Sequence, residues 1–292
     1  MNIQKHASRL AVLVLAATIA CTKTDQTPLS VEVFTGQENG FLVNSTLISG
    51  EREAALIDAQ FTLSDGEQLA EKIQASDKNL KAIFITHAHP DHYFGLEKIT
   101  ARFPNAEVIA APEVVEQIKT LWPQELAQWK PLYGDNLTGA PILPTPFEAD
   151  HFMLEGRRIE LIKLEPGEVE NSTAVYVPSI KTAVTGDAVF NGTHLWLAEV
   201  DSARRQGWLR NLDKLKQLQP QVVIAGHKAP DAANTPEVLD SCVQYINDFN
   251  RVLSESHSAA EVITKMTEKY GDRKLPIILD FAAKAAFGEM GH

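Results

Sequence analysis

The sequence predicts an α/β fold, and two patterns support that prediction. Short runs of apolar and β-branched residues alternate with longer stretches in which apolar residues recur at helical spacing. Three of the short runs, 81–86, 181–187 and 221–227, end at or just before a side chain that can bind a metal ion. With 292 residues, of which 44% are hydrophobic and 22% charged, the chain has an ordinary globular composition and enough apolar residues for a sizeable core.

The first twenty residues have the pattern of a signal peptide. A charged start is followed by an apolar run over 10–20, which is too short to cross a bilayer as a helix. The run ends in Thr18-Ile19-Ala20-Cys21, which resembles the lipobox of bacterial lipoproteins, where the cysteine becomes the lipidated N-terminus. We therefore expect an exported, periplasmic lipoprotein anchored to the membrane through Cys21. Plain secretion is the alternative, because Thr18 stands where that pattern usually has Leu.

The rest of the chain divides into three parts. Residues 21–30 are polar and aperiodic, as expected of a tether, and the folded domain should occupy 31–235. Residues 236–292 are expected to form a helical extension that packs on this domain. The only cysteines are Cys21 and Cys242, so a lipidated Cys21 would leave Cys242 without a disulfide partner, as a small buried hydrophobic residue.

The first half of the folded domain alternates strands with helices. Its strands are expected over 31–34, 40–48, 53–58, 81–86 and 108–111. Helices are expected over 64–76, where Ser64 and Glu67 make a capping box, over 93–103, and over 112–133. The last of these helices contains Trp122 and Trp129, which we assign to the core, although a helix here could also cover a site.

The second half follows a Pro- and Gly-rich connector. A hairpin over 152–155 and 158–164 is expected to turn at Gly156-Arg157. Three further strands, 173–177, 181–187 and 221–227, and a helix over 208–218 follow. After residue 236 the pattern is mostly helical, with an apolar face marked by Val243, Ile246, Phe249 and Leu253.

A metal site is the simplest interpretation of the loop that follows strand 81–86. Four side chains that can bind a metal lie within six residues: His87, His89, Asp91 and His92. Imidazole and carboxylate suit Zn, Fe, Mn or Ni, and no cysteine is nearby, which argues against a closed structural zinc. Asp187 and His227 follow later strands, where a rigid scaffold could aim them at the same site. Asp58 also ends an apolar strand, and is either a turn residue or a carboxylate that supports the ligands.

With His87-Ala-His89-Pro-Asp91-His92, Thr185-Gly-Asp187 and Gly226-His227 in this order, the chain resembles the metallo-β-lactamase-fold hydrolase superfamily over about residues 31–230. The resemblance implies a four-layer αββα sandwich with two divalent metal ions in the cleft between its sheets, most simply Zn, with Mn or Fe as alternatives. It also implies that His87 and His89 bind the first metal, that Asp91, His92 and His227 bind the second, and that Asp187 bridges both. Asp58 matches the acidic residue that supports the ligands from behind.

The third ligand of the first metal departs from the family pattern. Many members carry Pro-Gly-His-Thr there, whereas this chain has Pro166-Gly167-Glu168-Val169. Alkyl sulfatases of the same superfamily use a Glu in that region, so Glu168 is the expected substitute. The alternatives are that Glu170 or His151 is the third ligand, or that the first metal site is weak or empty. The C-terminal extension expected of alkyl sulfatases is missing, which disfavours that activity.

The resemblance implies hydrolysis by a hydroxide that bridges the two metals. With three carboxylates and the hydroxide, the inner shell would be about neutral, which favours neutral or weakly anionic substrates over phosphodiesters or sulfates. We expect an ester, lactone, thioester or amide substrate, with Asp91 transferring a proton to the leaving group. The alternatives are a β-lactamase, an iron oxygenase with a single metal that acts on persulfides, and a noncatalytic metal-binding lipoprotein.

Substrate contacts and partners are less well defined by the sequence. Residues 190–196 are expected to cross the mouth of the pocket, which makes His194 and Trp196 candidate substrate-binding residues. Tyr93, next to the ligand loop, is a third candidate. A structural role for His194 is equally open. The formal net charge is −11 and no stripe of Lys and Arg is present, so nucleic acid is an unlikely primary partner and a small molecule is the expected one. The substrate itself and the oligomeric state stay open.

Overall fold

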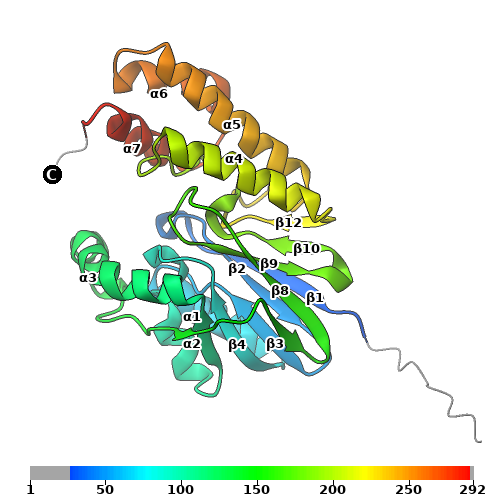
Figure 1. Ribbon diagram of the computed structural model, residues 1–292. Helices are drawn as coiled ribbons and strands as arrows, with labels where there is room; N and C mark the ends of the chain where they lie inside the picture. Colours follow the sequence, from blue (N-terminus) through cyan, green and yellow to red (C-terminus); the bar gives the residue numbers. More distant parts are fainter. Residues whose placement is uncertain (1–26, 290–292) are drawn as a thin grey trace, which may run out of the picture.

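Four layers of secondary structure make up residues 27–289, the part of the chain that the computed structural model describes. Two β-sheets face each other, and helices cover the outer face of each sheet (Figure 1). This arrangement confirms the expected αββα sandwich. The expected signal peptide, Cys21 and most of the tether lie outside the described residues. None of the helices within 27–289 is long and apolar enough to cross a membrane.

The first sheet has six strands that follow one another in sequence order. The first three pair antiparallel and the remaining pairs are parallel. The strands are β1 (Ser30–Thr35), β2 (Asn44–Ser49), β3 (Glu53–Ile57), β4 (Asn79–Ile85), β5 (Glu107–Ala110) and β6 (Thr145–Pro146). The outer helices of this half are α1 (Leu63–Ala75), α2 (Leu96–Arg102) and α3 (Pro112–Tyr133).

The second sheet has five strands in the order β12-β10-β9-β8-β7, and a short parallel pair, β11 with β13, lies beside it. Its strands and the short pair are β7 (His151–Leu154), β8 (Arg157–Lys163), β9 (Thr173–Val177), β10 (Thr182–Val184), β11 (Phe190–Asn191), β12 (Val222–Ile224) and β13 (His227–Lys228). The helices of this half are α4 (Ser202–Gln217), α5 (Glu237–Ser254), α6 (Ala259–Tyr270) and α7 (Pro276–Ala286).

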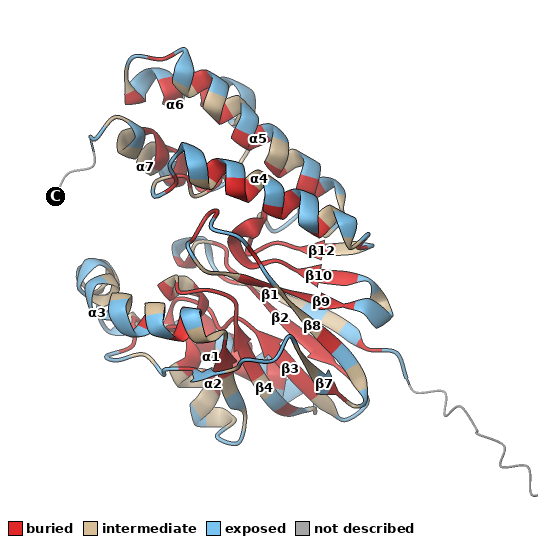
Figure 2. Ribbon diagram, in the orientation of Figure 1, coloured by how far each residue is buried: buried red, intermediate tan, exposed pale blue. Residues whose placement is uncertain are grey.

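Apolar packing fills all three spaces between the layers. Phe84 of the first sheet and Val175 of the second belong to one buried cluster between the sheets. The central strands β2, β3, β9 and β10 are accordingly almost continuously buried, whereas β1 and β8 have more exposed positions and the helices expose their outer faces (Figure 2). Trp208 of α4 and Ile246 of α5 share another cluster, which also contains the fully buried Cys242. The C-terminal helices thus pack on the second half through the same core as α4.

Most element boundaries lie close to the expected ones, but three N-terminal boundaries differ. The strand expected from residue 40 begins at Asn44, because Phe41 and Leu42 have positive φ values of 62° and 55° and form a turn instead. Helix α1 is capped by Thr62, whose side chain accepts a hydrogen bond from the Asp65 N–H, rather than by a box that starts at Ser64. Helix α4 is capped by Asp201 and begins six residues before the expected position 208.

The helix expected over 93–103 is also shorter than the sequence indicates. It begins at Leu96, and a separate 3₁₀ turn, η2 (Pro90–His92), precedes it. Asp91 and His92 therefore lie on this turn and not at the helix N-terminus. Gly95 makes the tight connection possible, since a Cβ there would lie 2.2 Å from the carbonyl oxygen of Ala59.

Candidate metal centre

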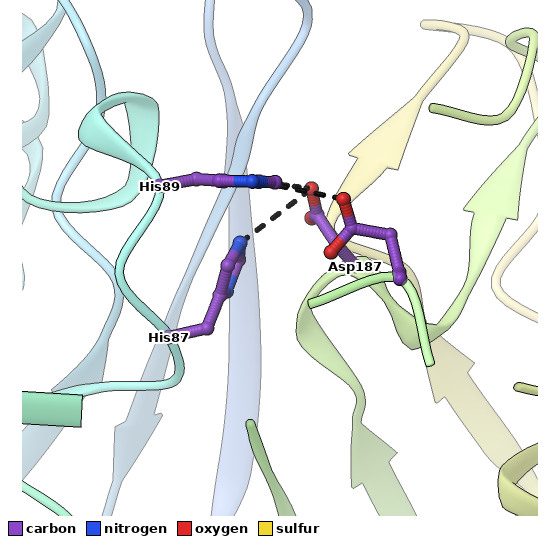
Figure 3. A group of neighbouring side chains, drawn as sticks. His87, His89 and Asp187 are labelled. Atoms are coloured by element: carbon purple, nitrogen blue, oxygen red, sulfur yellow. Dashed lines mark ion pairs between the residues drawn. The ribbon is translucent and has the colours of Figure 1, made fainter. Parts of the chain in front are cut away.

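Loops from both sheets meet in one cleft and bring together the seven predicted ligands. The segment after β4 carries His87, His89, Asp91 and His92 from the first sheet. The second half contributes Glu168 from the loop between β8 and β9, Asp187 from the 3₁₀ turn after β10, and His227 from β13. Figure 3 shows His87 and His89 pointing across the cleft toward Asp187. The fold brings these segments together although 140 positions separate His87 from His227, as the resemblance implied.

The ligand atoms form two groups, and the members of each lie within 4.8 Å of one another. The first group comprises His87, His89, Glu168 and Asp187, and the second comprises Asp91, His92 and His227. Within residues 27–289, neither Glu170 nor His151, the alternatives to Glu168, belongs to such a group. His151 instead lies on β7, where its Nδ1 contacts Asp150 at 2.7 Å.

Asp187 lies between the two groups and contacts an imidazole on every side. Its Oδ2 atom is 3.6 Å from Nε2 of His87 and 3.7 Å from Nδ1 of His89, both in the first group. The same oxygen is 3.1 Å from Nε2 of His227, and Oδ1 is 3.0 Å from Nε2 of His92. Asp187 therefore occupies the position that a bridging carboxylate would need.

Hydrogen bonds on the far side of three imidazole rings fix which nitrogen faces the cleft. His92 Nδ1 donates to Asp58 Oδ2 at 2.8 Å, and His227 Nδ1 donates to the Phe41 carbonyl oxygen at 2.7 Å. His87 Nδ1 lies 2.9 Å from Thr86 Oγ1. In each ring Nε2 is left facing the centre, with its lone pair available to a metal. The turn at Phe41 and Leu42 has a role here, since it brings the Phe41 carbonyl to His227.

Asp58 supports both groups from behind. Its carboxylate accepts hydrogen bonds from the Thr86 N–H and the Thr86 hydroxyl, each at 2.8 Å, in addition to the bond from His92. Because the Thr86 hydroxyl donates to Asp58, it must accept from His87 Nδ1. Asp58 thus orients His92 directly and His87 through Thr86. The structure brings Asp58 to the position that the supporting-carboxylate interpretation requires.

The loop that carries Glu168 is held against α4 by several contacts. Arg204 donates hydrogen bonds to the carbonyl oxygens of Gly167 and Glu168. The Asn211 side-chain amide bonds both the N–H and the carbonyl of Glu165, at 2.9 and 2.8 Å. Gly207 lets the helix approach closely, since a Cβ there would lie 2.0 Å from the Pro166 carbonyl oxygen. These contacts fix a loop without regular secondary structure, so that Glu168 reaches the cleft.

The chemistry of this centre fits divalent metal ions. Five polar atoms that face it are buried and have no hydrogen-bond partner within residues 27–289: His87 Nε2, His92 Nε2, both carboxylate oxygens of Glu168, and Asp187 Oδ1. Leaving buried polar atoms unpaired costs about 1–3 kcal/mol each. Imidazole nitrogens and carboxylate oxygens pointing at one space are the ligands that Zn²⁺, Mn²⁺ and Fe²⁺ accept.

The pKa values at the centre show opposed charges confined to a buried space. Burial, with the neighbouring His92 adding to it, lowers the pKa of His87 to about 4. Burial acts in the same direction on His89, but Glu168 and the two aspartates outweigh it and raise the pKa of that imidazole to about 10. Burial raises the pKa of Glu168 well above its usual range. A divalent cation would satisfy all of these side chains in their deprotonated, metal-binding forms.

A cleft lined by aromatic and acidic side chains opens above the centre. Asp91, Asp187, His89 and His227 form its floor. Of the three predicted substrate-binding residues, the structure places only Trp196 on its wall. The cleft walls are formed by Phe41, Phe61, Pro90, Glu125, Gln128, Trp129, Phe190, Trp196, Glu199 and Ile278.

Tyr93 and His194 do not line the cleft, so the structure gives no support to a substrate contact by either, and His194 has the structural surroundings that the sequence left open as its alternative. The Tyr93 ring is fully buried in the cluster under α1 and α2, where it packs against Phe94. His194 is 2% exposed, and its Nδ1 lies 2.8 Å from the Tyr245 hydroxyl of α5. The strand pattern around residues 190–196 could not reveal that α5 covers this side chain.

Helix α3 contributes cleft residues that the sequence did not identify as such. Gln128 and Trp129 follow Glu125 by three and four positions and therefore lie on the same side of the helix as Glu125. The unusual richness in Trp is the only signal in the sequence, and such residues are expected in the core. Trp129 serves both roles, because it also packs edge-on against Phe41 and Phe61.

Comparison with known proteins agrees with the geometry of the centre. A family model described as the metallo-beta-lactamase superfamily matches residues 39–227, which is more than half of the chain. A "Probable metallo-hydrolase" of Streptococcus pyogenes serotype M6 is 26% identical over 163 residues, covering 50% of this chain and 65% of that protein. A hydroxyacylglutathione hydrolase of Haemophilus influenzae is 27% identical over 160 residues, covering 52% of this chain and 69% of that protein. The chain thus spans less than two thirds of the streptococcal relative.

Solved structures share the fold. The crystal structure of a metallo-beta-lactamase family protein from Thermus thermophilus superimposes with a TM-score of 0.61 at 21% sequence identity. The superposition covers 90% of this chain and 92% of that chain, so it includes the C-terminal helices as well as the two sheets.

Proposed function

The chain belongs to the metallo-beta-lactamase superfamily, and on that premise we propose that it is a metal-dependent hydrolase of carbonyl substrates. Thioesters, esters, lactones and amides are the candidate classes. The observation that carries the proposal is the contact of Asp187 with imidazoles of both ligand groups, in a centre whose remaining inward atoms have no partner. The names of the relatives, a metallo-hydrolase and a hydroxyacylglutathione hydrolase, support hydrolysis and make thioesters the first class to test.

The position of each residue suggests whether it binds metal or transfers a proton. When bound, divalent metal ions lower the pKa of a coordinated water molecule and stabilise negative charge that develops on a carbonyl oxygen. His87, His89, Glu168 and Asp187 would hold one ion, and Asp91, His92, His227 and Asp187 a second. Asp91 lines the cleft with a side chain that is 13% exposed, and its Oδ2 lies 3.4 Å from His227 Nε2. Because Asp91 lines the cleft, we propose that one of its carboxylate oxygens passes a proton to the leaving group.

Metal analysis of protein purified without chelator tests the number and kind of ions. Two ions per chain, together with hydrolysis of one substrate class in a panel of thioester, lactone, ester, amide and β-lactam, support the proposal. A single iron with oxygen consumption would replace it by an oxygenase, and a protein with no metal and no hydrolysis would be a binding protein. We propose Zn as the resident metal, with Mn or Fe as alternatives that the three carboxylates would also accept.

The assignment of Glu168 can be tested separately. Glu168→Gln keeps the size of the side chain but removes its charge, so we expect the variant to retain about one ion fewer per chain and to lose most of its activity. Glu170→Gln is the matched control, since Glu170 is exposed, two residues away, and outside both ligand groups. Full metal content in Glu168→Gln would show that the first group binds metal without this residue.

We also propose that the protein is an exported lipoprotein anchored through Cys21. Support comes only from the sequence of residues 1–21, which lie outside the described residues. In cells, the Cys21→Ser variant is expected to move from the membrane fraction to the soluble periplasmic fraction and to lose incorporation of labelled fatty acid. Unchanged membrane association of that variant would disprove the anchor.

A further inference from the structure

The walls of the cleft combine aromatic surface with negative charge. Trp129 of α3 and Trp196 of the loop before α4 both line it, together with three phenylalanines. The Trp196 indole Nε1 is buried and has no hydrogen-bond partner within residues 27–289. On the floor, Asp187 is 3% exposed and its Oδ1 also lacks a partner. A cleft of this kind, with largely apolar walls and a few polar groups among them, has the features of a ligand site.

Glu125 and Glu199 give the walls their charge. Glu125 projects from α3 on one side, and Glu199 lies in the loop before α4 on the other. No Lys or Arg lines the cleft, and within residues 27–289 no ion pair neutralises either carboxylate. Burial raises the pKa of Glu125; the imidazole of His89 opposes this rise, and the carboxylates of Glu199 and Asp91 add to it. A positive charge between these walls would relieve that repulsion.

The ligand centre does not offset this charge. Asp91, Glu168 and Asp187 together with a bound hydroxide would neutralise two divalent ions, so Glu125 and Glu199 would add net negative charge to the cleft. An anionic substrate would meet two carboxylates on entering, without a cationic side chain to bind it. A cationic group would meet carboxylates and two tryptophan side chains, a residue type whose ring attracts cations.

We propose that this cleft selects substrates that carry a positively charged ammonium group on an apolar body, and that Glu125 is a specificity-determining residue for them. The inference rests on the proposed hydrolase function and deepens it, since it names the charge class of the substrate. It also separates this chain from the named activity of its relatives, because a glutathione thioester carries net negative charge. Glu199 and the rings of Trp129 and Trp196 complete the subsite.

The test uses three S-acetyl thioesters of similar size and different charge: acetylthiocholine, 3,3-dimethylbutyl thioacetate and 3-(acetylthio)propanoate. Because their leaving thiols differ in acidity, the decisive quantity is how the ratio of kcat/KM values changes between the wild type and Glu125→Gln. We expect the ratio of cationic to neutral substrate to fall on the order of fivefold in the variant, as for loss of one partly exposed charge pair. In the same variant, the ratio of kcat/KM for the anionic substrate to kcat/KM for the neutral substrate should rise. High salt should reduce the wild-type preference.

Glu71→Gln is the matched control, since Glu71 is an exposed residue of α1 outside the cleft. The control should leave both ratios as they are in the wild type. An unchanged kcat/KM ratio in Glu125→Gln, or an equal change in Glu71→Gln, would overturn the inference. The proposed hydrolase function would still stand in that case if the neutral thioester is hydrolysed.

Binding provides a readout that does not depend on turnover. Calorimetry should show that benzyltrimethylammonium binds the metal-loaded wild type and binds Glu125→Gln about fivefold more weakly. If none of the thioesters is hydrolysed, thioester hydrolysis fails and this binding measurement decides the inference. Absence of benzyltrimethylammonium binding to the wild type, or equal affinity in the variant, would overturn it.

Discussion

Asp58 connects the two ligand groups at the scale of a single residue. It accepts three hydrogen bonds, has a positive φ of 60°, and is 2% exposed. A carboxylate in such a buried place is stabilised only by its donors, and two of those donors lead to His92 and, through Thr86, to His87. Orientation of ligands from both groups therefore depends on one side chain that would touch neither metal ion.

Asp58→Asn should weaken metal binding in both groups. The Thr86 hydroxyl and His92 Nδ1 both donate to Oδ2 of Asp58. An amide nitrogen in that position cannot accept either hydrogen bond, so we expect metal affinity to fall about 10- to 100-fold. Thr86→Val should weaken mainly the first group, because it removes only the link to His87. Competition with a chromophoric chelator measures both effects. Asp77→Asn is the control, since Asp77 is exposed and has a similar φ of 56°; an equal loss there would contradict the role of Asp58.

His194 makes stability depend on pH through burial away from the cleft. Burial, with the Arg273 guanidinium adding to it, lowers the pKa of His194 to about 4, whereas an unfolded chain titrates near 6.5. Between these values the unfolded state takes up a proton that the folded state does not. The contribution of His194 to stability is therefore lost as pH falls from about 6.5 toward 4, with a slope of up to about 1.4 kcal/mol per pH unit.

His194→Gln should remove this part of the pH dependence. Urea unfolding of the chelated wild type and variant at pH 7 and pH 5 measures the difference, and we expect the free energy of unfolding to fall more steeply in the wild type. Titration of the ligand imidazoles is common to both proteins and cancels. His257→Gln, in an exposed position, should follow the wild type. Parallel slopes for wild type and His194→Gln would show that His194 protonates normally in the folded protein.

At the scale of elements, α4 determines where Glu168 lies. The loop between β8 and β9 has no regular structure, and it reaches the cleft because Arg204, Gly207 and Asn211 hold it against the helix. Arg204 also donates to the Glu199 carbonyl oxygen at 2.8 Å. Arg204 thus holds the backbone of both a predicted ligand, Glu168, and a charged residue of the cleft wall, Glu199.

Gly207→Ala should displace the loop and reduce metal binding in the first group. The added Cβ would lie 2.0 Å from the Pro166 carbonyl oxygen, so the loop must move, and we expect a loss of about 1–3 kcal/mol in stability. Metal titration should show the first ion bound more weakly and the second little affected. In Gly139→Ala a Cβ meets nothing within 4 Å, so stability should change by less than about 0.5 kcal/mol. Equal metal binding in Gly207→Ala and wild type would show that the loop does not need α4.

The same elements show what could be predicted from the sequence and why the rest could not. His87, His89, Asp187 and His227 were identifiable because ligand chemistry resides in residue type and in position at strand ends. The early start of α4 at Ser202 was not identifiable, because its first residues are mostly polar and give no helical pattern of apolar residues. The turn at Phe41 was not identifiable either, because it lies in an apolar run and depends on long-range contacts. Glu125 was missed because only the docking of α3 over the cleft distinguishes it from a solvated helix residue.

At the scale of the whole molecule, the metal centre lies between two halves that have separate outer cores. Asp91 and three of the histidines come from the first half, and Glu168, Asp187 and His227 from the second. Backbone contacts cross the same boundary, since the Thr173 N–H donates to the Thr86 carbonyl oxygen at 3.0 Å. The four layers were implied by the resemblance carried by the ligand motifs, whereas the pattern of strands and helices predicted only the α/β class, and the closeness of the halves is visible only in the packing between the sheets.

Metal removal should therefore destabilise the whole fold rather than a single loop. A metal ion that binds only the folded state and is present at 1,000 times its Kd adds about 4 kcal/mol to the free energy of unfolding. That corresponds to roughly 10 °C in Tm for a chain of this size. We expect chelation to lower Tm by that order in a single transition, since the buried ligand atoms of both halves lose their partner together. Asp187→Ala, which lacks the carboxylate between the groups, should have a low Tm that chelator hardly changes. A chelator effect of equal size in this variant, or melting of one half alone, would show that the centre does not join the two halves.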